Sequence, residues 1–150
     1  MKHIDIFTDG ACAGNPGVGG WSAILRYKSF EKEISGGCLS TTNNRMELTA
    51  VIEALKSLKE KCEVTVVTDS QYVVNAVNNK WLFSWADNGW KNARNKQVPN
   101  RDLWEKLIKL INSHSTTFVW VKGHNGHPEN EKCDVLAVNE CENIKNKYHL

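Results

Sequence analysis

Four acidic residues in this 150-residue chain stand where carboxylates could meet and do chemistry. Asp9 follows a short run that alternates apolar and polar side chains, and Asp69 follows a short β-branched run, so both are expected just after strands. Glu47 falls in the first turn of an expected helix, and Asp134 lies in the last expected helix. Ligands of open α/β sheets bind beyond the carboxyl ends of the strands, where side chains from these places can converge. The pattern therefore predicts a carboxylate cluster at one edge of a sheet.

Such a cluster needs cations, because carboxylates at short range repel one another and raise one another's pKa values. Mg²⁺ suits the set, since it takes hard oxygen ligands and keeps waters and substrate phosphate oxygens around it. Two such ions, about 4 Å apart, would activate a water and stabilise the leaving oxygen of an in-line phosphoryl displacement. We expect two Mg²⁺ ions when substrate is bound, with Mn²⁺ as a possible substitute.

Each acid also has a simpler structural explanation. Asp9, with a glycine behind it, is typical of a hairpin turn, and Asp69 could cap the helix that follows it. Glu47 lies three residues after Asn44, near the spacing of a capping box, and Asp134 could be a solvated residue on a helix face. A metal site is favoured by the joint pattern and not by any one acid.

Apolar periodicity predicts the elements that must position these acids. Three sequential strands with short connections should pair antiparallel. The strand and helix alternation that follows implies a parallel layer beside them. We expect an α/β fold whose five-stranded mixed sheet, with three antiparallel and two parallel strands, is flanked by helices. The expected strands are 4–7, 20–28, 31–38, 63–68 and 116–121, and the expected helices are 44–59, 70–77, 100–112 and 129 to about 142.

Composition and length are those of an ordinary globular domain, with 24% charged and 41% hydrophobic residues. We expect one domain, residues 1–142, and a polar tail, residues 143–150, that frays. The five cysteines are scattered without a CxxC pair, which fits reduced thiols in the cytoplasm. The N-terminus lacks the apolar segment of a signal peptide, and no apolar run is long enough to span a bilayer. We therefore expect a soluble cytoplasmic monomer that does not bind a membrane.

Six segments, in order and with few length changes, resemble bacterial type 1 ribonuclease H over residues 1 to about 140. One such motif would be moderate evidence for the resemblance, whereas six in register are strong evidence for it. The segments are FTDG (7–10), NPG (15–17), TTNNRMEL (41–48), TDSQYV (68–73), WVKGHNGHPENE (120–131) and CD (133–134).

The resemblance implies a ribonuclease H-like fold and an endonuclease that cuts the RNA strand of an RNA–DNA hybrid, leaving 3′-hydroxyl and 5′-phosphate ends. Asp9, Glu47, Asp69 and Asp134 match the family's four metal-binding acids, with Asp9 bridging both ions. His124 matches a family histidine on a loop that is proposed to shuttle a proton or help the product leave.

Recognition of the hybrid is implied in the same way. The 2′-OH marks the RNA strand and can be recognised by short polar groups near the metals. Asn15 and Thr42 resemble residues that hold phosphates. For Asn43 and Asn44, helix capping and turn formation are an alternative role that could coexist with binding. The residues implied to lie along the minor groove are Cys12, Asn43, Asn44 and Gln71.

Residues 80–98 combine tryptophans with cations and resemble the protruding handle that the family places against the DNA strand. The implied contacts are Trp81, Trp85 and Lys91, although both tryptophans could equally pack in the core. Residues 86–88, Ala-Asp-Asn, stand where the family usually carries several cations. Fewer cations weaken binding. We therefore expect a raised KM with little change in kcat, and a lower KM when Lys-Lys-Arg replaces these three residues.

Three alternatives account for the residues less well. A transposase or Holliday-junction resolvase shares acids on a similar sheet, but would not explain residues 41–48 or the His124 loop. Nothing in the sequence favours a catalytically weak or inactive hybrid-binding module, because all four acids are present. A zinc site fits no standard finger spacing, and its thiolates would not suit Mg²⁺. Its ligands would be His124, His127, Cys133 and Cys141.

Overall fold

The computed structural model describes residues 1–123 and 127–150, and β1 (His3–Gly14) lies at the centre of its sheet. The strand order is β3-β2-β1-β4-β5. β1 pairs antiparallel with β2 and parallel with β4, and β4 in turn pairs parallel with β5. The expected five-stranded mixed sheet is thus confirmed. The other strands are β2 (Gly17–Tyr27), β3 (Phe30–Thr41), β4 (Glu63–Thr68) and β5 (Ser115–Trp120).

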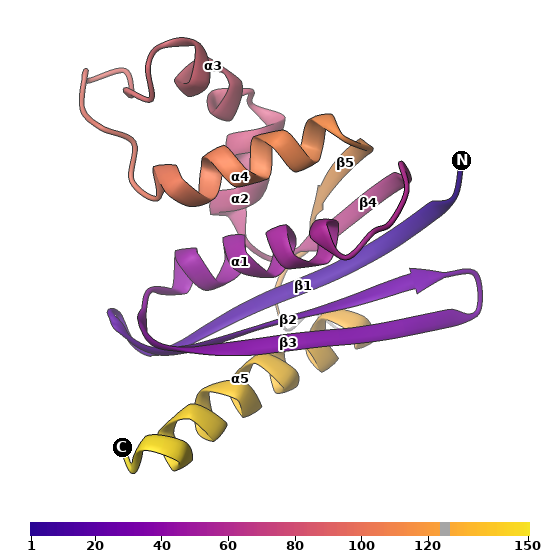
Figure 1. Ribbon diagram of the computed structural model, residues 1–150, viewed down its shortest axis with the longest axis vertical. Coiled ribbons are helices and arrows are strands. Elements are labelled where there is room, and N and C mark those ends of the chain that lie inside the picture. Colours follow the sequence, from indigo (N-terminus) through magenta and orange to yellow (C-terminus); the bar gives the residue numbers. More distant parts are fainter. Residues whose placement is uncertain (124–126) are drawn as a thin grey trace.

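Helices cover both faces of this sheet (Figure 1). One face carries the large core, in which Leu48 and Trp104 are fully buried against strand residues such as Ile6 and Val66. The other face carries a smaller cluster that includes Phe7, under the last helix. Among the described residues, no helix combines the length and the apolar character needed to cross a bilayer. The helices are α1 (Asn43–Lys56), α2 (Gln71–Asn78), α3 (Trp81–Asp87), α4 (Arg101–Asn112) and α5 (Pro128–Tyr148).

The first strand is longer than its sequence pattern predicts. β1 pairs with β4 only as far as Phe7, but its pairing with β2 continues to the Gly14–Gly17 pair. Asp9 therefore lies inside β1, so the expectation that it follows the end of a strand is wrong, and so is the hairpin-turn alternative. The glycine-rich stretch pairs as a ribbon, and its missing side chains let helices approach closely. A Cβ on Gly10 would lie 2.6 Å from the backbone nitrogen of Glu47 on α1.

Several helix boundaries also differ from expectation, and α3 has no counterpart among the expected helices; two of the differences concern the site and the C-terminal tail. α1 begins at Asn43 because Thr42 is its N-cap, accepting a hydrogen bond from the Arg45 N–H at 3.2 Å. Glu47 consequently lies in the second turn and not in the first. α5 continues to Tyr148, so most of the segment expected to fray is helical. The physical reason is tertiary packing, since Ile144 on the added turns packs close to Gly37 of β3.

His114, between α4 and β5, gives the fold a dependence on pH. Its Nδ1 accepts a hydrogen bond from the Cys62 N–H at 3.1 Å, and burial, with a smaller contribution from Lys61, lowers the His114 pKa below its usual 6.5. The unfolded chain therefore binds this proton at higher pH than the folded protein, and the free energy of unfolding falls as the pH drops below 6.5.

Between pH 7.5 and pH 5, we expect the free energy of unfolding to fall by about 1 kcal/mol less in the His114→Gln variant than in the wild type. Urea unfolding of both proteins at the two pH values measures it. Equal pH dependence in the two proteins would contradict this account of His114.

Candidate active site

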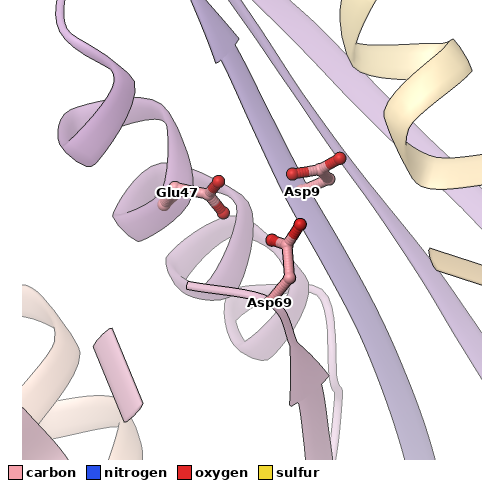
Figure 2. A group of neighbouring side chains, drawn as sticks. All are labelled: Asp9, Glu47 and Asp69. Carbon is pink, nitrogen blue, oxygen red and sulfur yellow. The ribbon is translucent and has the colours of Figure 1, made fainter. Parts of the chain in front are cut away.

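Three carboxylates from distant parts of the chain point toward one another at the rim of the sheet (Figure 2). Asp9 comes from the middle of β1, Glu47 from α1, and Asp69 from the residue that follows β4. One oxygen from each lies within 4.8 Å of the others. Asp9 and Glu47 are only 7% and 5% exposed. The structure thus brings together three of the four predicted acids, with Asp9 and Glu47 buried and Asp69 half-buried.

Local backbone contacts hold the cluster in place. The Gly10 N–H donates to Asp9 Oδ1 at 2.9 Å. Ser70 and not Asp69 caps α2, because the Ser70 hydroxyl accepts from the Val73 N–H. Since Thr42 caps α1, neither Glu47 nor Asp69 serves as a helix cap, and the simpler explanations for these two acids are wrong.

Burial and mutual repulsion perturb the titration of the cluster. Burial, followed by the charge of Asp69, raises the pKa of Asp9 from 3.8 to about 7. The same two causes, burial and then the charge of a neighbour, here Asp9, raise the pKa of Glu47 well above 4.5. A hydrogen bond between Asp9 and Glu47 lowers the pKa of Asp9 and raises the pKa of Glu47. Without a cation, this site holds fewer than three negative charges near neutral pH.

Asp134, the fourth predicted acid, lies beside the cluster on α5. It lines one pocket with Asp9 and Asp69, and its charge adds to the rise in the Asp9 pKa. His124 lies outside the described residues. The remaining residues that line this pocket are Lys122, Gly123, His127, Asn130 and Glu131.

The donor set fits a hard divalent cation. All the converging ligand atoms are carboxylate oxygens. Glu47 Oε2 is buried and has no hydrogen-bond partner among the described residues, as expected of an atom that a metal would satisfy. Cys133 is a poor zinc ligand, because it donates its thiol hydrogen to the Phe7 carbonyl and burial raises its pKa to about 12.

A second pocket, of about 500 Å³, is lined in part by Glu47 and Asp69. It brings three of the predicted minor-groove residues beside the acids. Asn15 lies next to this group, since its Oδ1 accepts from the Asn43 N–H at 3.1 Å. Cys12 is half-buried, and its thiol donates to the Thr41 carbonyl. The residues that line the pocket are Asn43, Asn44, Glu47, Asp69, Ser70, Gln71 and Trp120.

Some residues of the handle pack against the core, and others are exposed to solvent. Trp85 packs edge-on against Trp104, with ring centroids 5.6 Å apart, so its ring belongs largely to the core. Trp81 is 48% exposed, and Lys91 is exposed on the loop after α3. α3 and this loop lie at the opposite end of the molecule from the end of α5 (Figure 1). Of the two tryptophans, Trp81 is the more exposed.

Asp87 at the end of α3 gives a cleaner test of the handle's charge than residues 86–88 together, because Ala86 packs partly against the core. We expect Asp87→Lys to lower the KM for a hybrid about threefold at low salt, with kcat unchanged and the difference lost at high salt. Glu142→Lys on α5 makes the same charge change far from the handle and should leave KM unaltered. Steady-state kinetics at two salt concentrations measure these effects. An equal change of KM in both variants would contradict a local role for the charge at residue 87.

Sequence reasoning did not single out several residues of these pockets. Trp120, Lys122, Asn130 and Glu131 all line one pocket or the other. They belong to the segment 120–131, one of the six that resemble the family, from which the resemblance implies a role only for His124. The sequence signal that could have identified them is their position, which runs from the last residue of β5 to the first turn of α5, the helix that carries Asp134.

Fold and site together place the chain in a known class, the ribonuclease H-like α/β domains with a carboxylate cluster at the rim of a mixed sheet. Within that class it belongs to the RNase H family, whose model matches residues 1–142. Ribonuclease H of Nitratidesulfovibrio vulgaris (strain DP4) is 62% identical over 134 residues, 89% of this chain and 86% of that protein. Ribonuclease H of Rhizobium etli is 57% identical over 145 residues, 97% of this chain and 95% of that protein.

Solved structures agree with this assignment. LC9-RNase H1, described as a type 1 RNase H with the type 2 active-site motif, superposes with a TM-score of 0.85 at 30% identity, covering 95% of this chain and 74% of that one. LC11-RNase H1 in complex with an RNA/DNA hybrid has the same fold, with a TM-score of 0.73 at 22% identity, covering 94% of this chain and 98% of that one. The chain is thus an enzyme of the ribonuclease H type.

Proposed function

We propose that this enzyme is an endonuclease that hydrolyses the RNA strand of RNA–DNA hybrids, leaving 3′-hydroxyl and 5′-phosphate ends. The observation that carries the proposal is the buried cluster of Asp9, Glu47 and Asp69. A site that concentrates acids beside a polar pocket suits hydrolysis of a phosphate backbone once cations are bound. The hybrid seen with LC11-RNase H1 supports the substrate class.

Asp9, Glu47, Asp69 and Asp134 would hold two Mg²⁺ ions when substrate is present, or Mn²⁺ in their place. Bound Mg²⁺ supplies an activated water and neutralises charge that develops on the phosphate oxygens. The chain's own contribution is the carboxylate set, supplied by β1, α1, the residue after β4, and α5. His124, outside the described residues, would move a proton or assist product release.

Substrate selection rests on the polar residues around the second pocket. Asn43, Asn44 and Gln71 are exposed beside Glu47 and Asp69, where amide groups can hydrogen-bond a ribose 2′-OH. Cys12 would lie along the same groove. The phosphate of a neighbouring nucleotide would be held by Asn15 and Thr42, and the DNA strand by Trp81, Lys91 and the edge of Trp85.

We also propose that the enzyme acts as a monomer in the cytoplasm. The acids of the cluster all come from one chain, which supports a monomer. All five cysteines are free thiols, which supports a reducing compartment.

The test is cleavage of a hybrid labelled on either strand, with Mg²⁺ and with EDTA, beside duplex RNA and duplex DNA. We expect cutting of only the RNA strand of the hybrid, abolished by EDTA, with products that carry 3′-hydroxyl ends. Hybrid binding without cutting would indicate an inactive binding module. Cutting of duplex DNA would assign the chain to the DNA-processing relatives of the fold.

A further inference from the structure

Trp120 is a large aromatic residue exposed at the active site. It is the last residue of β5, paired in register with Thr68 of β4, one residue before Asp69. Its indole is 43% exposed although its N–H is engaged, donating to the Asp69 carbonyl at 3.1 Å. A ring anchored at its polar edge and open to solvent elsewhere presents an apolar surface in a fixed orientation.

The backbone to which the ring is anchored is itself well fixed. The carbonyls of the two residues before Asp69 also accept hydrogen bonds, Val67 from the Asn130 side chain at 3.2 Å and Thr68 from the Val121 N–H at 3.0 Å. Three successive carbonyls at the end of β4 are therefore held by groups from β5, its following residue and α5. The indole and Asp69 consequently share one rigid frame.

Trp120 forms one wall of the pocket of about 500 Å³ that also holds Glu47 and Asp69. The other lining side chains are polar or acidic, so the ring is the only large apolar surface among the described residues of that pocket. Bases of an intact hybrid are stacked inside the duplex, and its minor groove presents ribose edges, with apolar C–H groups beside the 2′-OH. An indole next to hydrogen-bonding amides matches that mixed surface.

We propose that Trp120 contacts the RNA strand, packing its indole against a ribose next to the cleaved phosphodiester, while its N–H positions Asp69. This inference rests on the proposed function. The two parts can be separated, because Trp120→Phe keeps an aromatic face and loses the N–H, whereas Trp120→Ala loses both. Tyr148→Ala, at the far end of α5, is a matched control, since Tyr148 is 45% exposed.

Two measurements test the proposal: anisotropy of a labelled hybrid in EDTA, which reports binding without cleavage, and kcat and KM with Mg²⁺. We expect Trp120→Ala to bind at least about tenfold more weakly, with KM raised to match. Trp120→Phe should bind within about twofold of wild type while its kcat falls about 3- to 10-fold. Tyr148→Ala should match wild type in both measurements.

The proposal is overturned if Trp120→Ala binds the hybrid as wild type does and only kcat or thermal stability changes, because the ring would then be structural. Should Trp120→Ala not fold, Trp120→Leu, which keeps bulk without a ring, replaces it and must show the same loss of binding. A wild-type protein that neither binds nor cuts the hybrid would refute the proposed function itself, so the two failures are distinguishable.

Discussion

Replacing Asp9 by Asn will lower kcat on a hybrid by about 10³-fold or more and, in the absence of metal, will make the protein more stable. The loss of activity is expected because the amide cannot supply the charge that holds Mg²⁺ beside the phosphate. The gain in stability is expected because Asp9 is a buried acid that repels its neighbours. The isosteric amide still accepts the hydrogen bond from the Gly10 N–H.

The pH dependence of this gain follows from the raised pKa. Asp9 titrates near 3.8 in the unfolded chain and at about 7 in the folded protein, so the folded state binds the proton more tightly. The free energy of unfolding of the metal-free wild type therefore falls as the pH rises from 4 to 7. The Asn variant lacks this contribution, so its advantage should be absent below pH 4 and reach about 4 kcal/mol well above pH 7.

Thermal and urea unfolding in EDTA, across that pH range, measure the effect. Asp5→Asn, the same substitution four residues earlier on β1, is the control and should keep kcat within about twofold. Added Mg²⁺ should stabilise the wild type and leave the Asp9→Asn variant nearly unchanged. If the variant were less stable than wild type at pH 8 in EDTA, repulsion within the cluster would not be the dominant effect at Asp9.

Gly10→Ala will cost both stability and activity. A Cβ at this position would lie 2.6 Å from the Glu47 nitrogen and 2.7 Å from the Met46 carbonyl carbon, and both are backbone atoms that cannot rotate away. α1 must therefore move off β1, which we expect to cost about 2–3 kcal/mol. The shift separates Glu47 from Asp9, and a displacement of this kind should lower kcat about 100-fold.

Gly37→Ala on β3 is the control for this prediction. The nearest atom to its added Cβ, at 2.5 Å, belongs to the Ile144 side chain, which can move. We expect it to cost less than about 1 kcal/mol and to leave kcat unchanged. Urea unfolding and steady-state rates of the two variants give the comparison, and similar costs for both would show that the contact between β1 and α1 is not special.

Local signals predicted much of the site. Asp69 was correctly expected just after a strand, because a short β-branched run ends there whatever packs around it. The order of the strands and helices was equally legible, since amphipathic spacing shows which faces are buried. Asp9 was misplaced because glycine-rich segments usually form turns, whereas here the glycines make room for a helix.

The helix ends and the handle are two places where local sequence patterns do not predict the structure. Thr42 and Asn44 are both good capping residues, and only the path of the chain leaving β3 selects Thr42. Trp81 and Trp85 are the same residue type one helical turn apart, yet only Trp85 meets Trp104. Contacts between distant segments decide these cases, and periodicity within a segment cannot report them.

By itself the sequence determined which chemical groups are available and in what order they occur: four acids, the amides near them and the elements that carry them. Tertiary structure alone decided that oxygens of three of these acids lie within 4.8 Å of one another and that two are buried. Burial depends on what α1 and its neighbours cover, and it is the first cause of the rise in the Asp9 pKa to about 7. Ordinary carboxylates thus form a site that needs cations, because the fold buries them close to one another.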